Sequence, residues 1–183
     1  MRLASVTGVF ALGGALGLAV AQDYGKKPEK AAAPSLQDMK PPAPIQDKLL
    51  DSFVGTWTVK STFMGQPFEG TAKYEWVLGH QFLKGTEANK GPGWTYEGEG
   101  FWRVEGGEYT SWWFDNMGGA GTMKGKLEGS TLKTSGIDPK MGPFRGETKL
   151  VGPDEMTWWF EADPERDGTF AKMGEGTSKR VNR

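Results

Sequence analysis

Hydrophobic and polar residues alternate along residues 55–63, and the same alternation recurs through most of the chain. Trp57, Val59 and Phe63 fall on one side of an extended segment, while threonine and lysine occupy most of the positions between them. A period of two predicts a β-strand that buries one face and exposes the other. This segment is therefore the first predicted strand.

A short helical pattern precedes this strand. Four apolar residues share one face of a helix over residues 45–53, namely Ile45, Leu49, Leu50 and Phe53. Gly55 ends the pattern and allows the bulky indole of Trp57 to follow at the start of the strand. We expect the apolar face of this helix to plug one end of the fold.

Nine more segments with strand-like patterns follow at nearly even spacing. Together with the first, the predicted strands are residues 55–63, 68–78, 81–89, 94–104, 108–115, 119–127, 131–137, 144–151, 155–162 and 169–181. The links between them are too short for a crossover helix, so consecutive strands are expected to pair antiparallel. If the sheet closes into a barrel, no strand is left with an unpaired, exposed edge. The pattern predicts an all-β fold: a roughly ten-stranded antiparallel up-and-down β-barrel with a short N-terminal helix, over residues 45–183.

The Gly106-Gly107 turn predicts the register of the two strands that it joins, because a two-residue hairpin pairs its flanking residues directly. The predicted inner pairs are Val104 with Tyr109, Trp102 with Ser111, Gly100 with Trp113, and Gly98 with Asp115. The predicted outer pair is Phe101 with Trp112. A glycine opposite an indole leaves room for it, so we expect Trp113 to lie in a slot between Gly100 and Gly121 as part of the barrel lining.

Several motifs resemble known families. The residues Gly55-x-Trp57 and Lys179-Arg180 are similar to the lipocalin and calycin arrangement, in which a C-terminal cation covers the tryptophan of the first strand. Four segments resemble a bacterial family known as domain of unknown function 1579: Leu-Leu-Asp-Ser-Phe-Val-Gly-Thr-Trp at 49–57, Phe-Met-Gly-Gln-Pro-Phe-Glu-Gly-Thr at 63–71, Leu-Gly-His-Gln-Phe-Leu at 78–83 and Tyr-Thr-Ser-Trp-Trp-Phe-Asp-Asn-Met-Gly at 109–118. This resemblance covers roughly residues 49–180. It implies a lipocalin-like barrel without an established activity, and His80 stands where that family is expected to carry glycine.

The N-terminal region has a different composition. Residues 1–21 contain Arg2, an uncharged apolar run and a small-x-small ending, which predicts a Sec-type signal peptide and a periplasmic or secreted protein. The apolar run is shorter than the roughly 20 residues that cross a bilayer, so no membrane span is expected. Residues 22–44 are rich in lysine, alanine and proline, which predicts a disordered tether. A partner-binding polyproline peptide is the alternative.

Composition narrows the classes of function. The chain has 22 basic and 23 acidic residues and a formal net charge of -1, which disfavours nucleic-acid binding. It has no cysteine, one histidine and no Gly-x-Ser-x-Gly, so no catalytic residue, metal site or cofactor is predicted and an enzyme is not expected. His80 is interpreted as a solvated turn residue, with a haem or metal ligand as the alternative.

The inward positions supply the candidates for a ligand cavity: Trp76, Glu87, Tyr96, Trp102, Trp113, Asp115 and Trp158. The two carboxylates among them, Glu87 and Asp115, each need a partner, because a buried unpaired charge is unfavourable. Water, a turn amide or an arginine at the rim would satisfy them. Alternatively, they orient the polar head of a bound molecule.

Two functional hypotheses lead. In the first, the barrel carries or senses a small apolar or amphiphilic molecule, since ten strands can enclose a cavity; the many inward aromatic side chains could instead fill that space. In the second, the protein is a ligand-free interaction module with an outer aromatic patch of Phe101, Trp112 and Phe114. A protein partner, a second copy, a sugar ring or the N-terminal tether could cover this patch. A second copy is the simplest of these, which predicts a homodimer. Haem binding through His80 ranks third, and catalysis last.

Overall fold

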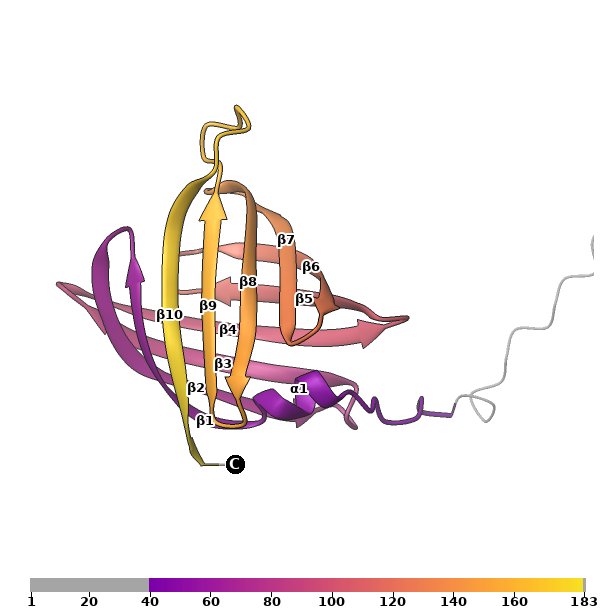
Figure 1. Ribbon diagram of the computed structural model, residues 1–183. Coiled ribbons are helices and arrows are strands. Elements are labelled where there is room, and N and C mark those ends of the chain that lie inside the picture. Colours follow the sequence, from indigo (N-terminus) through magenta and orange to yellow (C-terminus); the bar gives the residue numbers. More distant parts are fainter. Residues whose placement is uncertain (1–39, 183) are drawn as a thin grey trace, which may run out of the picture. The chain divides into compact units, whose positions relative to one another are not determined.

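The computed structural model describes residues 40–182, and in that part the chain forms ten strands and one helix (Figure 1). The strands are β1 (Gly55–Phe63), β2 (Gln66–Val77), β3 (Phe82–Gly91), β4 (Trp94–Glu105), β5 (Glu108–Asp115), β6 (Ala120–Glu128), β7 (Thr131–Asp138), β8 (Gly142–Gly152), β9 (Glu155–Ala162) and β10 (Ala171–Asn182). Each strand pairs antiparallel with its sequence neighbours, and β1 pairs with β10 to close the barrel. The predicted all-β, ten-stranded antiparallel barrel is confirmed. The predicted signal peptide and residues 22–39 of the predicted tether lie outside the described residues.

Helix α1 (Lys48–Phe53) is shorter than predicted because Asp47 caps it. The Asp47 side chain accepts a hydrogen bond from the Leu50 backbone N–H at 2.9 Å, which satisfies one of the free donors of the first turn. The predicted apolar face is buried at Leu49, Leu50 and Phe53. It packs into a core formed with residues near the ends of the strands, among them Trp57, Leu83, Tyr109, Leu132 and Met156. We call this the helix end of the barrel.

The register predicted from the Gly106-Gly107 turn is confirmed. In the structure Val104 pairs with Tyr109, Trp102 with Ser111, Gly100 with Trp113, Gly98 with Asp115, and Phe101 with Trp112. On the other side of β5, Trp113 pairs with Gly121. Both glycines of the turn have positive φ, the backbone conformation that side-chain-bearing residues avoid. The alternation along each strand therefore assigns the inward and outward side chains throughout this wall.

Candidate binding site inside the barrel

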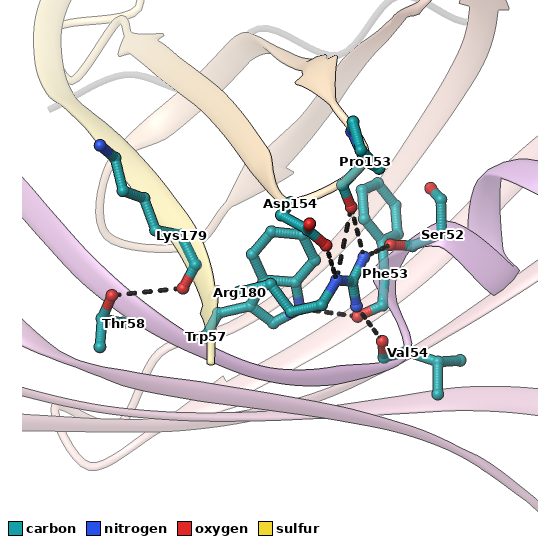
Figure 2. A network of polar contacts seen from close by, with 9 residues as sticks. All are labelled: Ser52, Phe53, Val54, Trp57, Thr58, Pro153, Asp154, Lys179 and Arg180. Carbon is teal, nitrogen blue, oxygen red and sulfur yellow. Dashed lines mark hydrogen bonds and ion pairs between the residues drawn. The ribbon is translucent and has the colours of Figure 1, made fainter. Parts of the chain in front are cut away.

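The helix end is sealed by Trp57 and Arg180 (Figure 2). Trp57 is fully buried, and its indole N–H donates to the Phe53 carbonyl at 2.7 Å. The Arg180 guanidinium lies 4.1 Å from the centre of the Trp57 ring, a distance typical of a cation–π contact. Lys179, the other cation named by the sequence pattern, is exposed, and its backbone carbonyl accepts from the Thr58 hydroxyl.

Arg180 also connects α1 and the β8–β9 turn to the last strand. Its guanidinium donates to the backbone carbonyls of Ser52 and Val54, which flank Phe53 at the end of the helix. It forms an ion pair with Asp154 at 3.0 Å and donates to the Pro153 carbonyl. Each nitrogen of the guanidinium thus has a partner at the end of α1 or in the β8–β9 turn, so this cluster has a structural role.

His80 and Trp76 also lie at the helix end, away from the other cavity candidates. Their rings are 4.0 Å apart, and the Trp76 indole N–H donates to Asp51 of α1 at 2.9 Å. His80 has a φ of 64°, in the left-handed region that glycine adopts most readily, which explains why glycine is expected there. The structure thus places His80 beside Trp76 and Asp51 of α1, and not with the inward carboxylates.

Polar side chains of β3, β4 and β5 form a cluster inside the barrel. The Asn89 side-chain amide donates to the Glu87 carboxylate, and the Trp113 indole N–H donates to the Tyr96 hydroxyl at 2.6 Å. Asn89 is 4% exposed, and its side-chain carbonyl oxygen has no hydrogen-bond partner among residues 40–182. This oxygen lies over the inner side of Gly70 on the neighbouring strand. The structure therefore pairs Trp113 with Tyr96, and it pairs Glu87 with Asn89, a residue that the sequence analysis missed.

Burial raises the pKa values of the acidic groups in and beside this cluster. Desolvation raises the pKa of Glu87, and the hydrogen bond from Asn89 offsets part of that shift. Burial also raises the pKa of Tyr74 and of Tyr96, and the Glu87 charge adds to both shifts. Burial thus disfavours the charged form of each of these three groups.

The pKa of Glu87 makes a testable prediction about stability. Because the folded pKa lies above the ordinary value of 4.5, the folded state binds the proton more tightly than the unfolded state does, and stability is lost as the pH rises from 4.5 through the folded pKa. Glu87→Gln should therefore raise the free energy of unfolding at pH 7 but not at pH 4. Urea denaturation at both pH values measures this. The exposed, outward Glu97→Gln is the control, and an equal response of both variants would contradict the assignment.

The Asp115 carboxylate finds its hydrogen-bond partners in the backbone of its own turn, unlike that of Glu87. Its carboxylate accepts from the backbone N–H groups of Met117 at 3.0 Å and Gly119 at 2.8 Å, which holds the β5–β6 turn. Asp138 does the same for Lys140 and Met141 in the β7–β8 turn. These two inward carboxylates at strand ends have local backbone partners. Glu87, in the middle of β3, has only Asn89.

The Trp113 indole does not lie in the slot that was predicted. It leans across β4, where a Cβ atom added at either Gly98 or Gly100 would overlap its ring. At Gly121, the nearest atom to an added Cβ is a carboxylate oxygen of Asp138 at 3.9 Å. The expectation of a slot between Gly100 and Gly121 is therefore wrong, although both pairings are correct. Side-chain torsion turns the indole toward Tyr96, where its N–H finds an acceptor.

This geometry predicts different costs for two similar substitutions. Gly98→Ala should destabilise the protein by about 1–3 kcal/mol, because its methyl group would displace the Trp113 indole. Gly121→Ala should change stability by less than about 1 kcal/mol, since its methyl group would lie 3.9 Å from the nearest atom, an ordinary van der Waals contact. Thermal unfolding followed by circular dichroism measures both. Equal losses would show that the indole does not rest on Gly98.

The inward aromatic side chains leave accessible surface inside the barrel. Tyr74, Tyr96, Trp102, Trp113 and Trp158 all face inward, yet each is only half-buried. The ring centres of Trp102 and Trp113 are 5.8 Å apart, and those of Tyr74 and Trp102 are 5.7 Å apart. In a closed barrel, the exposed part of an inward side chain faces the interior or its open end. The rings thus form an aromatic wall beside the Glu87–Asn89 pair.

The family model described as "Protein of unknown function (DUF1579)" matches residues 44–180. The chain belongs to this family. This DUF1579 chain is similar in structure to Rv2717c from M. tuberculosis, with a TM-score of 0.59 and 16% identity over 73% of this chain and 98% of that one. It is also similar to the S-type phycobiliprotein lyase CPES from Guillardia theta, with a TM-score of 0.58 and 7% identity over 74% of this chain and 92% of that one. At these identities the likeness supports the barrel fold. No curated protein matches the chain.

The outer wall of the DUF1579 barrel carries the predicted aromatic patch. Phe114 is 51% exposed, whereas Phe101 and Trp112 are half-buried. The ring centres of Phe82 and Trp112 are 6.0 Å apart, and the Lys84 ammonium lies 6.0 Å from the centre of the Phe101 ring. A shallow hollow of about 480 Å³ borders Phe114 on the outer face of β1 to β5.

Helix α1, the one helix of the described part, is too short to cross a membrane.

Proposed function

We propose that this DUF1579 protein is an exported barrel that binds a small apolar or amphiphilic molecule in its interior. The observation that carries the proposal is the Glu87–Asn89 pair. A carboxylate and an unpartnered amide oxygen inside a barrel are unfavourable for folding, because buried polar groups without partners lose their hydration. A bound molecule with a polar group would supply the missing partner.

The aromatic wall would hold the apolar part of the ligand. Trp102, Trp113 and Trp158 are half-buried and inward, and apolar pockets with a few placed polar groups are the usual form of small-molecule sites. The contacts of Arg180 and α1 close the helix end. Entry is therefore expected at the opposite end, where the β5–β6 and β7–β8 turns lie.

Binding is tested by titrating 1-decanol, decanoic acid, retinol and haem into purified protein while following tryptophan fluorescence. At least one probe should give a saturable shift, because a ligand in the interior changes the polarity around the inward indoles. Trp113→Phe should reduce the response, and the outward Trp112→Phe should not. Native mass spectrometry of protein purified without denaturation should reveal a bound small molecule. An unligated mass together with no saturable response to any probe would refute the proposal.

A second candidate function is an interaction surface on the outer aromatic patch, favoured by the exposure of Phe114. If a second copy covers this patch, wild-type protein should be a dimer in light scattering, and Phe101→Ser with Trp112→Thr should make it a monomer. The far-ultraviolet circular dichroism of the double variant should match that of the wild type. A wild-type monomer at high concentration would remove the dimer.

Export rests on residues 1–21 alone. Intact-mass measurement of protein from the periplasm or culture medium should give a mature chain that begins at Gln22. A cell-associated protein that retains Met1 would contradict export.

A further inference from the structure

The charge inside the barrel is unbalanced around Glu87. Among the inward-facing strand residues that the structure describes, Arg180 is the cation, and its guanidinium is committed to Ser52, Val54 and Asp154 at the helix end. The other inward carboxylates, Asp115 and Asp138, accept backbone N–H groups of their own turns. Glu87 receives only the neutral amide of Asn89. Its neighbourhood therefore lacks a positive charge.

Acceptors dominate the polar groups at this point. Glu87 presents a carboxylate, and the side-chain carbonyl of Asn89, 4% exposed, has no donor within residues 40–182. Because Asn89 uses its amide N–H to reach Glu87, its oxygen and the carboxylate are left as two acceptors that are two residues apart on the same face of β3. A partner for both must bring hydrogen-bond donors.

The surrounding rings also favour a cation. Tyr74 pairs across the sheet with Gly85, and Tyr96 pairs with Asn89, so both rings flank the Glu87 position. Aromatic faces attract ammonium groups, and a carboxylate beside such rings adds charge complementarity. A carboxylate ligand would meet the like charge of Glu87 and the acceptor oxygen of Asn89 here.

We propose that the interior site recognises an organic amine: a protonated ammonium head group that contacts Glu87 and Asn89, on an apolar body that lies along the aromatic wall. This inference rests on the proposed function and names the chemical class of its ligand. The ammonium group donates to both free acceptors and neutralises the carboxylate.

The titration of Glu87 gives a second readout. Burial raises the pKa of Glu87, and an ammonium group beside the carboxylate would lower that pKa. The groups that face it are Tyr74 from β2, Tyr96 from β4 and Asp115 from β5, together with Asn89 on its own strand. Amine binding should therefore release a proton, and affinity should rise with pH until Glu87 is ionised.

Isothermal titration calorimetry with three probes of equal chain length tests the inference: decylammonium, 1-decanol and decanesulfonate. Wild-type protein at pH 7 should bind decylammonium about tenfold more tightly than 1-decanol, as expected for charge-assisted hydrogen bonds, and decanesulfonate most weakly. Glu87→Gln should lower the affinity for decylammonium to about that for 1-decanol, so that the preference for the amine is lost. Glu97→Gln, which removes the same charge from the outer face of the same wall, should keep the preference.

The outcomes separate this inference from the proposed function. Equal binding of all three probes, or a preference for the amine that survives Glu87→Gln, would overturn the amine assignment and leave interior binding standing. Loss of the preference in Glu97→Gln would place the amine on the outer surface and overturn the assignment as well. If no probe binds wild-type protein and no ligand co-purifies, both the amine assignment and the proposed function fail. Affinity for decylammonium that does not change between pH 5 and pH 8 would contradict the proton release.

Discussion

Trp57→Ala is expected to lower the free energy of unfolding by about 3–5 kcal/mol, the usual cost of truncating a large buried aromatic side chain. Trp57 is fully buried, its indole N–H donates to Phe53, and its ring carries the Arg180 guanidinium. The substitution removes all three at once and leaves a cavity beneath α1. Urea denaturation at pH 7 measures the change.

The outward Trp159 provides the control for this experiment. It is half-buried on the outer face of β9, so Trp159→Ala should cost about 1 kcal/mol. A loss for Trp57→Ala no larger than that for Trp159→Ala would show that the helix end does not depend on the Trp57–Arg180 contact.

Arg180→Ala should cost a similar amount, about 3–5 kcal/mol, because removal of one partner leaves buried groups uncompensated. The Arg180 side chain is 5% exposed, and the carbonyls of Ser52 and Val54 lose their donors with it. Arg180→Lys should recover only part of the loss, since an ammonium group cannot reproduce the planar guanidinium fork. The melting temperature of each variant measures the effect.

Lys179 is the matched control for Arg180. It is the adjacent residue with the same charge, but its side chain is exposed, so Lys179→Ala should change stability by about 0.5 kcal/mol or less. Comparable losses at the two positions would mean that net charge, and not the contacts of the guanidinium, stabilises this end.

The strands and their register could be predicted because both depend on local rules. A period of two identifies a strand, and the two-residue turn at Gly106-Gly107 determines the pairing of the strands around it. Strands β1, β5 and β9 begin and end at the residues predicted from the sequence. The same alternation placed Glu87 and Trp113 on the inner face.

The contacts between inner side chains could not be predicted in the same way. Alternation determines the face of a residue but not its torsion angles, so the indole of Trp113 was expected beside Gly121 and lies over Gly98 and Gly100. The alternation also does not reveal that a backbone N–H of the β5–β6 turn donates a hydrogen bond to the Asp115 carboxylate. Asn89 was missed although its position, two residues after Glu87, placed it on the same face. A search for polar residues that neighbour an inward carboxylate would have found it.

The location of the ligand is tested most directly by quenching with 10-bromodecanol, because bromine quenches indoles that it contacts. If the molecule binds inside the barrel, quenching should be saturable and should fall in the Trp113→Phe and Trp158→Phe variants, which lose inward indoles. The outward Trp112→Phe and Trp159→Phe variants should retain it. Quenching that persists when both Trp113 and Trp158 are replaced, and that disappears in Trp112→Phe, would place the ligand on the outer wall and contradict interior binding.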